Sequence, residues 1–280
     1  MQTIITLNYD LGGMVSPFEA FDPPFMQTAA LELCLLALAG GLLGAWIVLR
    51  RLAFFAHAVG TATFPGLVVA EAAALSPQVA GLAVALGYSG GVARSRAGHT
   101  ATGLLLVASL ALGAVLASDL LGAGQSVDRL LFGTLIGLDR QDVAWSAAAA
   151  ALALAGTLAL GRAWTAVGFD REASAAIGLP ARTADALLLA AIAVATVAAL
   201  PAVGALLVSA LFVVPAATVR LLAPSVPALL AGSVALGAAE GIGGLYLAYV
   251  LDVSPGPAVA VVASGAYALV ALASGIARRA

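Results

Sequence analysis

The chain of 280 residues is 62% hydrophobic and only 9% charged, with a mean hydropathy of +1.09 and a formal net charge of -2. Soluble domains carry about 25% charged residues, so this composition excludes an ordinary soluble globule and indicates a polytopic membrane protein. All 12 basic residues are arginine, which excludes a P-loop lysine or a lysine Schiff base in this chain. The arginines are scattered, so nucleic acid is not an expected partner.

Nine apolar stretches set the expected fold, because about 20 apolar residues cross a bilayer as a helix. They are residues 26–49, 53–75, 77–93, 100–118, 142–161, 184–200, 203–222, 226–250 and 256–277. We expect an all-α membrane bundle of about 8–9 transmembrane helices, with an extracytoplasmic tail over residues 1–25 and a single transmembrane domain over residues 26–280.

The arginines also predict the sidedness of the bundle. If the amino terminus lies outside, Arg129 and Arg140 are the basic residues left outside, and the other ten of the 12 face the cytoplasm. This bias predicts an outside amino terminus and a cytoplasmic carboxyl terminus. The first 49 residues contain no Lys or Arg, so we expect no cleavable signal peptide.

The second stretch contains His57, and Thr61 follows it by four residues. An ionisable side chain is costly in lipid, so we expect His57 to face a protected path. A packed histidine bonded to a backbone carbonyl is the structural alternative. Pro65 in this stretch and Pro215 in the seventh predict broken helices, which line cavities in transporters or simply aid packing.

Two polar segments separate the later stretches. Residues 119–141 are too interrupted to span and too apolar for a free loop, so we expect a short helix at the outer interface. Residues 168–180 predict a short cytoplasmic helix, with Asp170 capping its start and Gly178 and Pro180 at its end. A rigid exposed helix there could receive force from a soluble motor, but an ordinary loop helix has the same pattern.

Carboxylates also occur inside the apolar stretches. Glu240 lies near the middle of the eighth stretch, where a charged carboxylate costs roughly 2.5–3.5 kcal/mol, so we expect it to face protein or water. It either joins His57 in a transient metal site or is protonated and bonds a neighbouring helix. Glu71 and Glu32 lie nearer the outer interface, where snorkelling of the side chain explains them.

A series of motifs carries a family resemblance. They are Val48-Leu49-Arg50-Arg51, Phe64-Pro65-Gly66, Leu131-Phe132-Gly133, Gly168 to Pro180, Ala202 to Leu221, and Asp252 to Pro257. In this order and spacing, the chain resembles the permease subunits of the manganese/zinc/iron family of ABC importers. The likeness covers nearly everything after residue 25 and extends in general fold, of type II, to cobalamin and siderophore permeases.

The resemblance implies a homodimeric permease in the plasma (inner) membrane, surrounded by lipid. It implies that the loop helix, with Arg171, Glu172, Ala173 and Gly178, docks into a cytoplasmic ABC ATPase. An extracytoplasmic metal-binding protein is implied to deliver the ion. ATP would bind to the ATPase, so we expect no cofactor, catalytic residue or enzymatic activity in this chain.

The chain departs from the family pattern in its second stretch. Similar permeases usually carry an aspartate and a histidine four residues apart, where this sequence has His57 and Thr61. The spacing still places both on one helix face, but the carboxylate is absent and threonine is a poorer ligand. The resemblance favours a metal pathway at His57, with Thr61 beside it and Glu240 replacing the missing carboxylate.

The expected function is import of divalent transition-metal ions by ATPase-driven alternating access. Imidazole suits zinc better than it suits ions that prefer hard oxygen ligands, so His57 favours zinc, with manganese or iron as alternatives. A second hypothesis is a permease of the same fold with a diverged substrate, such as a chelated metal. A third is a motor-independent channel or an intramembrane enzyme, for which the sequence offers no convincing acidic ring or nucleophile and base.

Overall fold

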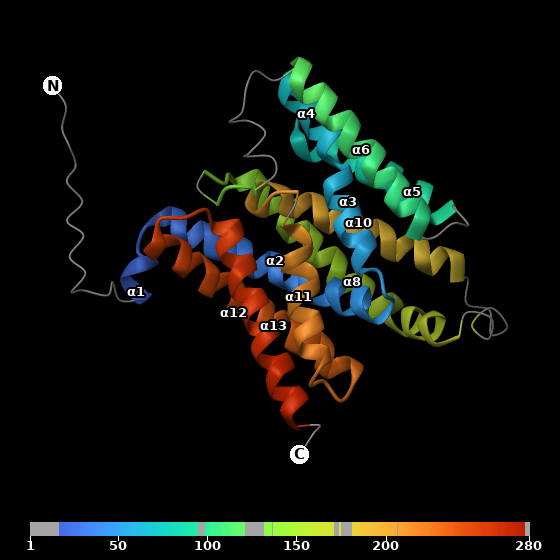
Figure 1. Cartoon of the computed structure of the whole chain (residues 1–280), viewed down its shortest axis with the longest axis vertical. Coiled ribbons are helices and arrows are strands. Elements are labelled where there is room, and N and C mark those ends of the chain that lie inside the picture. Colours follow the sequence, from blue (N-terminus) through green and yellow to red (C-terminus); the bar gives the residue numbers. More distant parts are fainter. Residues whose placement is uncertain are drawn as a thin grey trace.

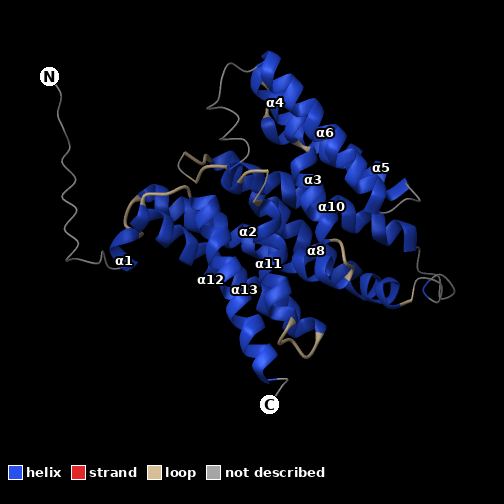
Figure 2. Cartoon of the chain, in the orientation of Figure 1, coloured by secondary structure: helices blue, strands red, loops and turns tan. Residues whose placement is uncertain are grey.

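The computed structural model describes residues 17–94, 99–120, 132–135, 137–170, 174, 181–205 and 207–277, and every regular element among them is a helix (Figure 1 and Figure 2). The helices are α1 (Pro17–Ala20), α2 (Pro24–Leu49), α3 (Ala53–Ala62), α4 (Phe64–Ala72), α5 (Pro77–Arg94), α6 (His99–Leu120), α8 (Arg140–Phe169), α10 (Ala181–Val203), α11 (Val208–Arg220), α12 (Val226–Leu251) and α13 (Pro255–Ala277). Seven helical segments of this part of the chain are long and apolar enough to cross a membrane. The predicted all-α polytopic bundle is confirmed.

Each of the nine predicted stretches coincides with a helix, or with the pair α3 and α4 for residues 53–75. The fifth is longer than predicted, because α8 begins at Arg140, two residues earlier, and continues to Phe169, eight residues beyond the predicted end. Asp139 caps it: its Oδ1 accepts from the Asp142 backbone N–H at 2.9 Å, and Asp142 Oδ2 accepts from the Asp139 N–H at 3.1 Å. Of the predicted interface helix over residues 119–141, residues 121–131 and 136 lie outside the described residues.

The prolines break one predicted helix and not the other. The second span is interrupted at Thr63, between α3 and α4, and Pro65 stands in the first turn of α4, where its missing N–H has no cost. The predicted break at Pro215 is wrong, because α11 continues through it. Proline removes only one hydrogen bond and its φ is compatible with a helix, so packing holds α11 together.

α10 is followed by Gly204, whose φ of +75° is open to glycine without strain. Pro201 lies inside α10, two residues before its end. The predicted sixth and seventh stretches, residues 184–200 and 203–222, are thus separate helices, and α10 extends three residues beyond the first of them, to Val203.

The most buried segments of the bundle are α2, α10 and the α3–α4 pair, whose apolar windows are 72%, 72% and 78% buried (Figure 1). α2 packs against α8, α11 and α12, while α10 packs against α8 and α5, and α6 covers α3 and α4. The apolar windows of α6 and α13 are only 17% buried, so each turns most of its apolar surface outward. That outward surface is suited to lipid.

Glycines let α2 approach two neighbours backbone to backbone. A Cβ atom added at Gly44 would lie 2.0 Å from the carbonyl oxygen of Phe212 in α11. One added at Gly41 would lie 2.6 Å from the Cα atom of Val234 in α12. Small residues at such contacts allow the close helix packing that stabilises membrane bundles.

Three of the motif segments meet at one junction. Gly133, with φ +69°, lies so close to the end of α10 that an added Cβ would be 2.4 Å from the Gly204 nitrogen. The Thr134 N–H donates to the Pro201 carbonyl oxygen at 2.9 Å, and a Cβ at Gly256 would lie 2.8 Å from the Phe132 carbonyl oxygen. These glycines are required by backbone packing, which gives the motifs a structural reason.

Candidate functional site

His57 lies on α3 and is half-buried. Its Nδ1 atom is 3.1 Å from the Oγ of Ser209 on α11, a partner 152 residues away in the sequence. Thr61, one turn further along α3, is buried, and its hydroxyl donates to the His57 carbonyl oxygen at 3.2 Å. The imidazole is thus oriented by α11, while the Thr61 hydroxyl turns back to its own helix.

Glu240 lies on α12 among glycines and is 4% exposed. Neither carboxylate oxygen has a hydrogen-bond partner among the described residues. The preceding turn packs closely on α11, since a Cβ added at Gly237 would lie 3.6 Å from Pro215 Cγ. Glu240 therefore faces protein rather than lipid, as expected, and an unpaired carboxyl group at that depth is costly to the fold.

The two candidate ligands lie on different helices that both pack against α11. α11 packs against α3, which carries His57, and against α12, which carries Glu240. Within the described ranges, no group of three or more His, Cys, Asp and Glu side chains is close enough together to hold a metal ion. The structure thus contains separate candidate ligands around α11 and no tight cage among the residues it describes.

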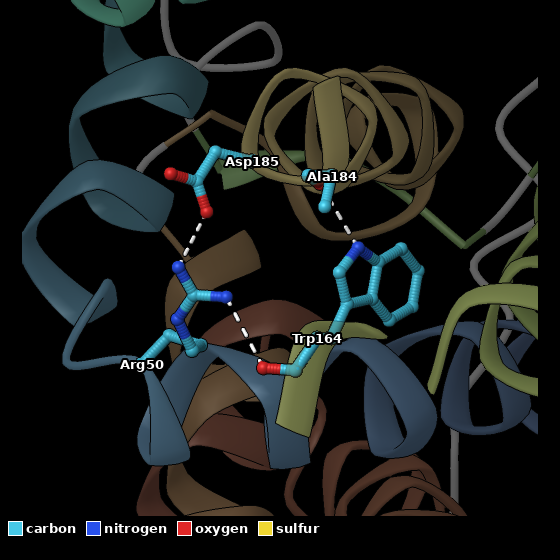
Figure 3. A network of polar contacts seen from close by, with 4 residues as sticks. All are labelled: Arg50, Trp164, Ala184 and Asp185. Carbon is cyan, nitrogen blue, oxygen red and sulfur yellow. Dashed lines mark hydrogen bonds and ion pairs between the residues drawn. The ribbon is translucent and has the colours of Figure 1, made fainter. Parts of the chain in front are cut away.

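A second polar centre, which we call the Arg50 cluster, joins Arg50, Trp164, Ala184 and Asp185 at the ends of three helices (Figure 3). The Arg50 guanidinium pairs with the Asp185 carboxylate of α10 and donates to the Trp164 carbonyl oxygen of α8 at 3.3 Å. The Trp164 indole N–H donates to the Ala184 carbonyl oxygen at 2.9 Å. α2, α8 and α10 are therefore tied together at these ends.

The Arg50 cluster borders the predicted coupling helix. α8 ends at Phe169, the Ser174 N–H donates to the Asp170 carbonyl oxygen at 3.1 Å, and α10 begins at Ala181. The coupling residues predicted for this connection, Arg171, Glu172, Ala173 and Gly178, lie outside the described residues. What the structure does describe is a firm attachment of both flanking helices to α2.

Sequence reasoning missed two groups in the bundle interior. Glu32 of α2, expected near the interface, is fully buried and accepts a hydrogen bond from the Ser146 hydroxyl of α8. Ser209, the partner of His57, was not singled out either. An acidic residue in an otherwise apolar span was the available signal for Glu32, whereas a lone serine in α11 gave none.

Apolar helices that cross a membrane, with ionisable side chains held inside the bundle, define the class of multi-pass membrane transport proteins. Residues 22–274 match the ABC 3 transport family, and the chain belongs to this family. The resemblance to the permease subunits of metal ABC importers is thereby confirmed. The chain is a multi-pass plasma-membrane permease and a transport subunit rather than an enzyme.

Curated relatives are similar over most of their length. The manganese transport system membrane protein MntC of Halalkalibacterium halodurans is 30% identical over 251 residues, which cover 88% of this chain and 86% of the relative. The manganese import system permease protein ScaB of Streptococcus parasanguinis is 26% identical, covering 84% of this chain and 85% of that protein. The sequence likeness thus spans nearly the whole membrane domain.

A solved structure supports the fold. PsaBC from Streptococcus pneumoniae in complex with Fab aligns with a TM-score of 0.80 at 23% sequence identity, covering 91% of this chain and 94% of the other. At this identity the likeness shows the shared fold. It does not assign individual ligands, which depend on the side chains of this chain.

Proposed function

We propose that this permease moves divalent manganese across the membrane, powered by a separate ABC ATPase and supplied by an extracytoplasmic metal-binding protein. The observation that carries the proposal is the similarity, over 84–88% of this chain, to permeases named for manganese transport. The family membership supports a motor-driven importer over a channel that works without one. Residues 26–280 would act as one permease domain, paired with a second copy.

His57, Glu240 and Thr61 are the side chains we propose for the ion's path. Ser209 holds His57 through Nδ1, so Nε2 is the nitrogen proposed to meet the ion. Glu240 offers two carboxylate oxygens without partners among the described residues. Separate ligands that act one after another suit transport, because an ion held by a complete cage would leave too slowly.

The proposed orientation of the chain in the membrane rests on the arginine bias, which supports an outside amino terminus and a cytoplasmic carboxyl terminus. The connection between α8 and α10 then faces the ATPase, and we propose that Arg171, Glu172, Ala173 and Gly178 dock there. The Arg50 cluster supports this assignment. A movement of the connection driven by the ATPase would be transmitted to α2 through the ends of α8 and α10, which the cluster joins to it.

Zinc is a second candidate cargo, favoured by one observation. The only side chain of the proposed path that is not an oxygen donor is the His57 imidazole, which suits zinc better than manganese. A chelated metal would instead need a wide passage with polar contacts to the chelator. Competition among these cargoes in one uptake assay distinguishes them.

The test uses the permease reconstituted in proteoliposomes with its ATPase and metal-binding protein. ATP-dependent uptake of radioactive Mn²⁺ is measured alone and against excess Zn²⁺, Fe²⁺ or chelated metal. We expect Mn²⁺ uptake that requires ATP and resists competition by chelates. Absence of ATP-dependent Mn²⁺ uptake by the wild-type complex would refute the proposal, and stronger uptake of Zn²⁺ would favour the second candidate.

A further inference from the structure

Glu32 is a buried carboxyl group that the proposed path does not use. It is 0% exposed in α2, where it meets α8 and α10. Its Oε1 accepts from the Ser146 hydroxyl, which also lies 3.4 Å from the Ala198 carbonyl oxygen, while Oε2 has no partner among the described residues. An acid placed only for structure is normally paired at both oxygens, because an unpaired polar atom in the interior is costly.

Oε2 of Glu32 is an acceptor without a donor in either protonation state. The ionised carboxylate leaves Oε2 unpaired among the described residues. In the neutral acid, Oε1 would carry the proton and donate it to the Ser146 hydroxyl, which would donate on to the Ala198 carbonyl oxygen, and Oε2 again has no donor. That oxygen is therefore free to bind a cation that arrives from elsewhere.

A line of polar side chains leads from one end of the bundle to Glu32. Asp142, half-exposed in the first turn of α8, lies one helical turn before Ser146 and on the same face. Its Oδ1 accepts from Gln78 Nε2 of α5 at 2.7 Å, and Gln78 Oε1 accepts from the Ser76 hydroxyl at 3.0 Å. Exposure thus falls from the half-exposed Asp142 to the fully buried Ser146 and Glu32.

We propose that the Glu32 carboxylate, the Ser146 hydroxyl and the Ala198 carbonyl oxygen form a transient binding site for a hard divalent cation, with Asp142 at its mouth. All of these donors are oxygens, the ligands that manganese and other hard ions take in preference to zinc. In the proposed orientation this end of the bundle faces outside, so the site would hold the ion as it enters. The inference rests on the proposed function and adds a separate site to it.

Glu32→Gln is the sharpest variant, because it keeps the shape and the acceptor for Ser146 and removes the charge. In the reconstituted complex, we expect the kcat/KM for Mn²⁺ uptake to fall at least tenfold, with the melting temperature retained. Glu71→Gln is the matched control, since Glu71 is an exposed carboxylate near the end of α4. It should transport as the wild type does.

Asp142→Asn tests the same site at a position that tolerates change. Asp139 still caps α8 in this variant, so the protein should fold, and we expect a two- to fivefold rise in KM for Mn²⁺ with kcat retained. Wild-type kcat/KM in Glu32→Gln, or wild-type KM in Asp142→Asn, would overturn the site. Both outcomes differ from failure of the proposed function, in which the wild-type complex itself would not take up Mn²⁺.

Discussion

The Arg50 cluster and the surroundings of Glu240 differ in whether their buried ionisable groups have partners. At the Arg50 cluster, the guanidinium, the Asp185 carboxylate and the Trp164 indole all have partners on neighbouring helices (Figure 3). Around Glu240, neither carboxylate oxygen has a partner among the described residues. Paired groups stabilise a bundle and an unpaired one does not, so Glu240 is retained for a reason other than stability.

The comparison predicts its largest effect at Asp185. Asp185→Ala leaves the Arg50 guanidinium largely buried without its anion, which should lower the free energy of unfolding by roughly 2–4 kcal/mol. Thermal unfolding of the purified permease in detergent measures this loss. The double variant Arg50→Met with Asp185→Leu should recover most of it, and a single variant as stable as the wild type would contradict the structural role.

A smaller loss is expected at Trp164. Trp164→Phe removes the indole donor to the Ala184 carbonyl oxygen, which keeps its bond within α10, so the cost is that of one hydrogen bond, about 0.5–1.5 kcal/mol. Trp46→Phe is the matched control, because its indole donates at 3.2 Å to the Thr157 side chain, whose hydroxyl is free to rotate, rather than to a backbone oxygen. Equal melting temperatures for the two variants would argue against a special contribution from the cluster.

At Glu240 we expect a substitution to leave the free energy of unfolding unchanged or to raise it. Glu240→Met replaces an unpaired carboxyl group by an apolar side chain of similar length, so the melting temperature should stay or rise, by up to about 1 kcal/mol in unfolding free energy. Mn²⁺ uptake should fall at least tenfold over the same change. A protein that is both destabilised and fully active would show that Glu240 is structural.

The smallest stability effect is expected at Thr61. Thr61→Val removes a hydroxyl bonded only to the His57 carbonyl within the same helix, worth about 0.5 kcal/mol or less. Mn²⁺ uptake in the reconstituted complex is measured for this variant and for His57→Gln. If the imidazole meets the ion, His57→Gln should lower the uptake rate much more than Thr61→Val does. Equal rates for the two variants would remove His57 from the proposed path.

The sequence was sufficient for the helices and insufficient for the pairings between them. Apolar length predicted all seven segments that are long and apolar enough to cross a membrane, together with α5 and α11, which are not among these seven. Pro65 marked the interruption at Thr63 to within two residues. The ion pair of Arg50 with Asp185 joins residues 135 positions apart, a distance that no local pattern encodes. Glu32 was placed near the interface because burial depends on α8 and α10, whose positions the pattern of α2 does not contain.

The backbone contacts of α2 with α11 and α12 restrict how this permease can move. With Gly44 against the Phe212 carbonyl and Gly41 against the Val234 backbone, no layer of pliable side chains separates these helices, so sliding between them is resisted. We expect α2, α11 and α12 to travel as one rigid body. Hinge bending would then concentrate where helices are interrupted, at Thr63 after α3 and at Gly204 before α11. These are the two helices that the contact of His57 with Ser209 joins.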